Sequence, residues 1–181
     1  PTNEKIIKYK EGLAESYRVN GFLDSALVIY SKLQIDFHNI YAADPFRQAI
    51  LNNNMASLYD DLGQYNKAEE GYLNSISYFD KSKTQTNDYL IEGVSNLLIL
   101  YDKTNQFEKS LPLIQKLSEL LKDKAIKNIS FLSEKNRVEL IDYIIPRWVY
   151  VSSFAVKYSE YNPELLKSII ENNLVFKNIL F

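Results

Sequence analysis

The fold of this chain is decided by the stretch Leu62-Gly63-Gln64-Tyr65-Asn66-Lys67-Ala68-Glu69-Glu70-Gly71-Tyr72. It contains a glycine suited to a turn, followed by aromatic, small and aromatic residues at helical spacing, and Tyr59 lies just before it. The pattern recurs 42 residues earlier, after Tyr17, and 42 residues later, after Tyr101. A fixed period of this length indicates stacked copies of one supersecondary unit. Such proteins act through extended surfaces more often than through buried catalytic pockets, so the repeat favours a binding function.

The three copies keep the pattern to different degrees. The second copy has it in full, with Ala56, Tyr59, Gly63, Tyr65, Ala68 and Tyr72. The first copy has Ala14, Tyr17, Gly21, Leu23, Ala26 and Tyr30. The third copy is degenerate, with Leu98, Tyr101, Asn105, Phe107, Ser110 and Ile114.

Apolar residues recur at separations of three or four, which is typical of amphipathic helices. This spacing predicts three antiparallel helix pairs, over 4–20, 22–39, 45–62, 65–82, 87–104 and 107–124. A linker is expected at 125–132, then helices over 133–159 and 163–181. Asp44 before Pro45 and Asn162 before Pro163 are typical helix starts, and Pro146 predicts a kink or break near 143–145. We expect one continuous all-α domain, with the repeats in 1–124 and a helical extension packed on them in 125–181.

Composition excludes several classes of function. A net charge of −2 and a pI of about 5.5 argue against a nucleic-acid surface. Without cysteine, disulfides, thiolate zinc sites and cysteine nucleophiles are excluded. No apolar run approaches the roughly 20 residues that span a bilayer, and the first residues do not form a signal peptide. A start without Met suggests a fragment or a processed chain. We therefore expect a soluble, cytoplasmic protein that binds neither membrane nor nucleic acid.

The sequence offers little for catalysis. His38 is the only histidine and has no predicted partners, so a surface or packing role is its simpler interpretation. The neighbours Asp60 and Asp61, like Glu69 and Glu70, do not face each other on a helix. Neither a glycine-rich phosphate loop nor a Gly-x-Ser-x-Gly elbow occurs. We expect no enzyme activity, no metal and no cofactor.

The repeat, over residues 5–124, resembles the tetratricopeptide repeat in a variant with longer helices. The resemblance implies a right-handed superhelix whose concave face is lined by the first helix of each pair. An Asn on that face often hydrogen-bonds the backbone of an extended peptide, and Asn54 and Asn96 stand at this position, where the first copy has Gly12. An amide suits this task because it donates and accepts hydrogen bonds together.

The candidate peptide-binding residues share the corresponding helix faces. They are Asn53, Asn54, Ser57, Asp60, Glu92, Ser95, Asn96, Ile99 and Asp102. They include no Lys or Arg that could hold a terminal carboxylate, so the expected partner is a neutral or basic protein or extended peptide. The alternative is that Asn54 and Asn96 only hydrogen-bond between adjacent helices.

The last third of the chain resembles a segment that follows such repeats in bacterial CHAT proteins and precedes their caspase-like peptidase domain. The similarity rests on Phe131-Leu132-Ser133-Glu134-Lys135, Tyr161-Asn162-Pro163-Glu164-Leu165-Leu166 and Asn172-Asn173-Leu174-Val175-Phe176-Lys177-Asn178-Ile179-Leu180. Asn178 departs from the glycine of the family. Because the catalytic His and Cys of the family would lie beyond residue 181, the resemblance implies a non-catalytic recognition and regulatory module joined to a peptidase domain.

A second interpretation is a structural spacer or oligomerisation segment without a ligand in the groove. It is favoured by the apolar C-terminal helix, through which the chain could self-associate. The apolar residues of this helix are Ile169, Ile170, Leu174, Val175, Phe176, Ile179, Leu180 and Phe181.

Overall fold

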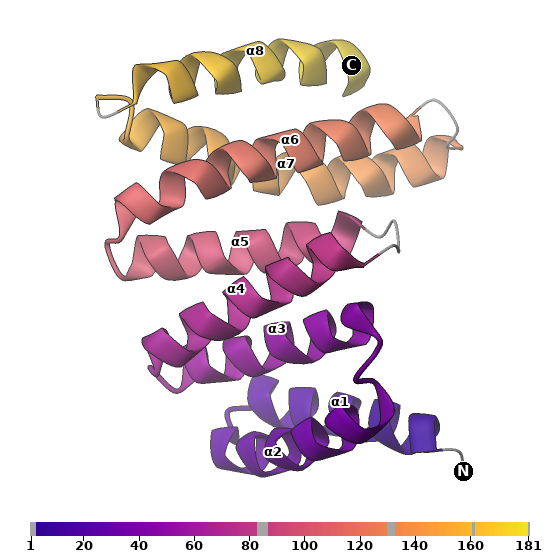
Figure 1. Cartoon of the computed structure of the whole chain (residues 1–181). Coiled ribbons are helices and arrows are strands. Elements are labelled where there is room, and N and C mark those ends of the chain that lie inside the picture. Colours follow the sequence, from indigo (N-terminus) through magenta and orange to yellow (C-terminus); the bar gives the residue numbers. More distant parts are fainter. Residues whose placement is uncertain (1–2, 83–86, 130–132, 161, 181) are drawn as a thin grey trace. The chain divides into compact units, whose positions relative to one another are not determined.

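The computed structural model describes residues 3–82, 87–129, 133–160 and 162–180, and every regular element in these ranges is an α-helix. Figure 1 shows the helices in chain order. They are α1 (Asn3–Val19), α2 (Leu23–Ile40), α3 (Pro45–Asp61), α4 (Tyr65–Lys81), α5 (Asn87–Lys103), α6 (Phe107–Ile129), α7 (Glu134–Lys157) and α8 (Pro163–Leu180). The all-α prediction is confirmed, and consecutive helices pack as neighbours within each of the two units described below. None of the described helices combines the length and apolar character needed to cross a membrane.

Three turns of the same geometry carry the 42-residue repeat into the structure. Gly21, Gly63 and Asn105 have positive φ, at 81°, 71° and 57°. In each turn the next residue donates its backbone N–H to the carbonyl of the repeat tyrosine. The distances are 2.9 Å at Tyr17, 2.8 Å at Tyr59 and 2.8 Å at Tyr101. This pattern is the Schellman ending of a helix, and Asn replaces Gly in the third copy because it tolerates the left-handed region.

The chain divides into two compact units, Pro1–Leu100 and Tyr101–Phe181, so the division falls within α5. In the first unit α1 packs on α2, α2 on α3 and α3 on α4. The core where the first two pairs meet consists of Ile7, Ala14, Ala26, Tyr30, Leu33, Phe37, Leu51, Met55 and Leu58. The part of α5 in this unit buries Ile91, Val94, Leu97, Leu98 and Leu100. Helices α1, α2 and α3 therefore share one core in the first unit.

In the second unit α6 packs on α7 and α8, and α7 packs on α8. The expected linker over 125–132 is wrong in its first part, because α6 continues to Ile129. Ala125 is fully buried one turn after the buried Leu121, so the apolar face of α6 extends beyond the predicted end. Residues 130–132, the last part of the expected linker, lie outside the described residues. Residue 161, which begins one of the motifs similar to CHAT proteins, also lies outside them.

Pro146 does not break α7, which runs without interruption from Glu134 to Lys157. The exposed ring of Pro146 faces away from the core, while Ile144 and Trp148 beside it are buried. The Arg147 guanidinium also donates to the carbonyl oxygen of Tyr143 at 2.9 Å. Pro146 lacks the N–H that would bond the carbonyl oxygen four residues earlier, at Asp142, and its buried neighbours Ile144 and Trp148 hold this turn in the helix.

The predicted helix starts are confirmed at both prolines. Asp44 Oδ1 accepts from the backbone N–H of Arg47 at 3.1 Å. Asn162 Oδ1 accepts from the backbone N–H of Leu165 at 3.0 Å. Each side chain satisfies one donor of the first turn, which has no partner within its own helix.

Candidate functional site

The nine candidate residues lie on α3 and α5. Asn53, Asn54, Ser57 and Asp60 come from α3, and Glu92, Ser95, Asn96 and Ile99 come from α5. These eight residues belong to the first unit, whereas Asp102 lies at the end of α5 in the second unit. His38 lies in α2, outside this set.

A hydrogen bond between two asparagines joins the two helices. Asn96 Nδ2 donates to Asn53 Oδ1 at 3.2 Å. Asn53 is only 6% exposed, and Asn96 is half-buried. Gly93 of α5 lies beside this bond, and a Cβ there would be in ordinary van der Waals contact with Asn53 Oδ1 at 3.8 Å. The bond fixes the Asn96 amide while leaving its oxygen and second N–H without a partner among the described residues.

Asn54 differs from its repeat equivalent Asn96. Its side chain is half-buried and makes no hydrogen bond within the described part of the chain. The amide is not among the fully buried polar groups that lack a partner in the described residues, so water can reach it, and it can both donate and accept. Asn54 is therefore the candidate residue with the most capacity left for a ligand backbone.

Ser57 is held between two neighbours rather than presented to a ligand. Its Oγ donates to the carbonyl oxygen of Asn53 at 3.1 Å and accepts from the Tyr72 hydroxyl at 3.1 Å. Burial raises the pKa of Tyr72 to about 12. The first copy has the same contact, since Tyr30 donates to Glu15 Oε2 at 3.3 Å.

The sequence reasoning missed this Tyr-to-first-helix bond. Its signal was a spacing of 15 residues between the second-helix tyrosine and a polar residue, present in the first and second copies. The third copy has Ile114 and Ile99 at these two positions. Neither isoleucine can form such a hydrogen bond, and Ile99 is 47% exposed on the candidate face.

The remaining candidate residues differ in what they contact. Ser95 Oγ donates to the carbonyl oxygen of Ile91 at 2.7 Å, within its own helix. Glu92 is exposed and Asp60 is half-buried. Asp102 pairs with Lys157 of α7 at 2.8 Å, and this hydrogen bond raises the pKa of Lys157. The Asp102 charge is thus largely balanced inside the second unit, while Asp60 and Glu92 give the α3 and α5 face its acidic character.

A cavity of about 290 Å³ lies on the other side of α3, in the first unit. It is lined by Gln34, Asn52, Met55, Ala56, Tyr59, Lys67, Glu70, Gly71 and Asn74. The Lys67 ammonium lies over the Tyr59 ring at 5.2 Å, and the third copy repeats this contact with Lys109 and Tyr101 at 5.3 Å. The contact recurs in the second and third copies, which points to a role in packing, whereas the first copy has Ser25 at the lysine position. None of the nine candidate residues lines this cavity.

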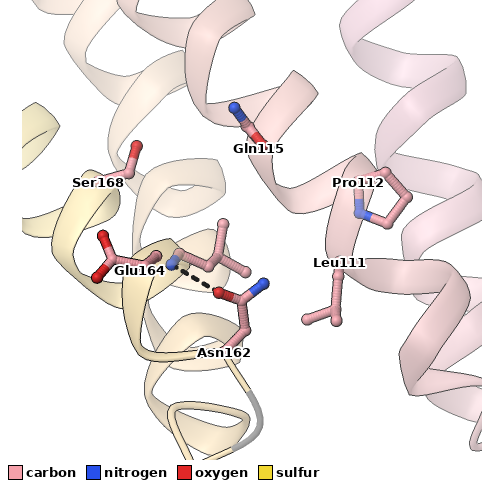
Figure 2. Close-up of a pocket in the computed structure, with 7 residues that line it drawn as sticks. Leu111, Pro112, Gln115, Asn162, Glu164 and Ser168 are labelled. Atoms are coloured by element: carbon pink, nitrogen blue, oxygen red, sulfur yellow. Dashed lines mark hydrogen bonds between the residues drawn. The ribbon is translucent and has the colours of Figure 1, made fainter.

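A larger cavity of about 410 Å³ lies in the second unit. Figure 2 shows Leu111, Pro112 and Gln115 of α6 on one side, and Asn162, Glu164 and Ser168 at the start of α8 on the other. The side-chain oxygen Oδ1 of Asn162 already accepts the backbone N–H of Leu165 as the cap of α8. The described residues hold no cluster of three or more His, Cys, Asp or Glu suited to a metal.

Comparison with known proteins adds no family to these observations. No family model matches the chain, and no curated protein matches it. What the site can do is therefore argued from its residues and their contacts.

Proposed function

We propose that this chain is a non-catalytic recognition module for a protein or an extended peptide, with its binding face on α3 and α5. The proposal takes the helices as a right-handed superhelix of the tetratricopeptide type, which puts the first helix of each pair on the concave face. The observation that carries it is the half-buried Asn54 amide, which has no hydrogen bond to any described residue and lies beside the fixed Asn53–Asn96 pair. Two amides in this arrangement suit a ligand backbone, which alternates donors and acceptors.

The chemistry of the face defines the ligand. Asp60 and Glu92 provide negative charge, and the nine residues include no Lys or Arg. Ile99 adds an exposed aliphatic side chain. A neutral or basic segment with an apolar side chain over Ile99 matches this face, because charge complementarity favours association and rejects acidic competitors.

The wider role that we propose follows from the similarity to bacterial CHAT proteins. In that setting the module senses a cytoplasmic partner and its C-terminal helices relay the bound state to a peptidase domain that follows in the same chain. The cap of α8 at Asn162 and the cap of α7 at Ser133 lie in the shared motifs. These two caps support the use of the motifs as helix starts.

A structural spacer or oligomerisation segment is the competing function. It is favoured by the Asn53–Asn96 bond, which is the contact expected if these amides serve packing alone. It is also favoured by Ile170 and Leu174 of α8, which are 51% and 60% exposed one turn apart. The side chains of 175 and 177–181, on which part of the apolar C-terminal helix depends, lie outside the described residues.

Selection from a random library of extended peptides separates the two functions. The wild-type protein is the bait, and Asn54→Ala and Ile99→Asp are the test variants. Asn66→Ala, an exposed asparagine at the start of α4, is the matched control. We expect neutral or basic peptides that bind the wild type and the control but lose at least about tenfold in affinity to both test variants. Equal binding by all four proteins, or no enriched peptide, would favour the spacer.

A further inference from the structure

The first helix exposes an apolar face that the equivalent helices bury. Tyr9 is 72% exposed and Leu13 is 36% exposed on α1. One period later, Leu51 and Met55 of α3 are only 3% and 5% exposed. Another period later, Gly93 is buried and Leu97 is fully buried on α5. Ile6, 40% exposed, lies on the same side of α1 as Tyr9 and Leu13, at positions i, i+3 and i+7.

The structure shows what covers this face in the later copies. Leu51 and Met55 of α3 pack in one cluster with Leu33 and Phe37 of α2. At this junction the covering element is α2, the second helix of the preceding pair. Leu33 of α2 therefore belongs to the same core as this face of the next first helix.

The third copy gives the same geometry independently. A methyl group on Gly93 of α5 would lie 3.7 Å from Ser75 Oγ and 3.6 Å from Ile76 Cγ1 of α4. Ser75 is the repeat equivalent of Leu33. The contact between a second helix and the following first helix thus recurs at the same register in both junctions of the first unit.

The exposed face of α1 is supported from behind. Ile7 and Ala14, on the opposite side of α1, are 2% and 0% exposed in the core with α2. Lys10 also pairs with Asp36 of α2 at 2.7 Å. The helix is therefore held in place by its own pair, and the outer face is presented without rearrangement. The face ends at the exposed Ser16, where α3 and α5 have the fully buried Leu58 and Leu100.

We propose that Ile6, Tyr9 and Leu13 form a docking face for an antiparallel helix pair presented by a partner protein. The second helix of that pair would place an apolar side chain over Tyr9 and Leu13, at the repeat position of Leu33, which shares one core with Leu51 and Met55. The match to two internal junctions specifies a helix pair of the same repeat type, rather than an extended peptide or a flat surface. This face is separate from the α3 and α5 face, so it does not depend on the proposed peptide recognition.

The test adds one further period to the full chain. Residues 3–44, one 42-residue unit containing α1 and α2, are duplicated directly ahead of Asn3, so that the added second helix meets the original α1. Nitration by tetranitromethane, read at each tyrosine by mass spectrometry, compares two copies of Tyr9 in one molecule. The added copy has no covering pair and serves as the internal reference. Circular dichroism establishes that the added residues are helical.

We expect the original Tyr9 to react at least about tenfold more slowly than the added copy, with slower amide exchange in the original α1. Leu13→Asp in the original copy alone should abolish that difference. Val28→Asp should preserve it, because Val28 is 55% exposed on the side of α2 away from its core residues. Equal reactivity of the two Tyr9 residues in a helical protein would overturn the proposal. Dimerisation of the unextended chain that Tyr9→Asp abolishes would also overturn it, since the face would then serve a second copy.

Discussion

Asn96 donates a hydrogen bond from Nδ2 to Oδ1 of Asn53 across 3.2 Å, and this bond links the first helices of two neighbouring pairs. Asn53 is 6% exposed, so its carbonyl oxygen has little access to water. Asn54, the repeat equivalent of Asn96, has no such bond within the described residues. Two residues that the period makes equivalent thus have different surroundings, and only one of them is tied to the packing of its neighbour.

This difference predicts opposite consequences for two alanine substitutions. Asn96→Ala should lower the free energy of unfolding by about 1–3 kcal/mol, because it leaves Asn53 Oδ1 buried without a donor. Asn54→Ala should change it by no more than about 0.5 kcal/mol. Urea unfolding of both variants measures the contrast. Similar small effects from both would mean that the bond contributes little to stability.

The Asn53→Ala/Asn96→Ala double variant completes a thermodynamic cycle. If the bond is the cause, the two single effects should not add, and the coupling should exceed about 0.5 kcal/mol. Additive effects would assign the loss to packing of each side chain by itself.

Local signals made most of the fold predictable. The left-handed positions at Gly21 and Gly63 and the caps at Asp44 and Asn162 are fixed by residues within one turn, which the sequence displays directly. The end of α6 was not predictable in this way, since 125–129 contain no glycine or proline to stop a helix. The helix continues there because Ala125 finds a place in the core.

The candidate site was less predictable because its contacts depend on which helices meet. The bond from Tyr72 to Ser57 lies within one pair, and the same spacing recurs in the first copy, so the period contains a signal for it. The Asp102–Lys157 pair joins the last repeat to α7, which lies outside the period. No spacing rule connects these two residues, and an acidic residue assigned to a ligand surface turned out to have a lysine partner.

Tyr72 provides a prediction for alkaline pH. Burial raises its pKa to about 12, above the ordinary value of 10.0. A raised pKa means that folding favours the neutral phenol, so this contribution to stability is complete below pH 10 and is lost as the pH rises from 10 to 12. Tyr72→Phe should cost about 1 kcal/mol at pH 8 through the lost bond to Ser57. The wild type should lose that advantage between pH 10 and 12.

Unfolding in urea at pH 8, 10 and 11.5 measures this difference. The comparison with Tyr72→Phe cancels the titration of the other tyrosines, which both proteins share. A difference that stays constant over this pH range would contradict the burial of an un-ionised Tyr72.

Two glycines should respond in opposite ways to the same substitution. A Cβ on Gly71 of α4 would lie 2.9 Å from Ala56 Cβ and 3.3 Å from the Asn52 carbonyl oxygen, so α3 and α4 approach too closely for a side chain. Gly71→Ala should destabilise the protein by about 1–3 kcal/mol, partly offset by better helix propensity. Gly12 of α1 has nothing within 4 Å. Gly12→Ala should therefore stabilise by about 0.5–1 kcal/mol. Thermal unfolding of the two variants measures both, and a Gly71→Ala variant as stable as the wild type or more so would contradict the close approach at Gly71.

In the second unit, Asn172 should be a stability centre. It is 8% exposed, and its Nδ2 donates to Ser118 Oγ at 2.8 Å. Its Oδ1 accepts from the Lys122 ammonium at 3.2 Å. Asn172→Ala removes both contacts at once and leaves the almost fully buried Ser118 hydroxyl without that donor. We expect a loss of about 1–3 kcal/mol in the free energy of unfolding.

Asn128→Ala is the matched control for this loss. Asn128 also lies in the second unit, on α6. Among the described residues its amide donates only to the Lys124 carbonyl oxygen, one turn earlier in the same helix, at 2.7 Å. That carbonyl is half-buried and can be solvated after the substitution, so the expected change is within about 0.5 kcal/mol. Urea unfolding, followed by the fluorescence of Trp148 between α7 and α8, reports on this unit directly, because Trp148 Nε1 donates to Asn173 Oδ1 next to the substituted residue. Equal effects of the two substitutions would show that the bonds of Asn172 between helices contribute no more than a bond within one helix.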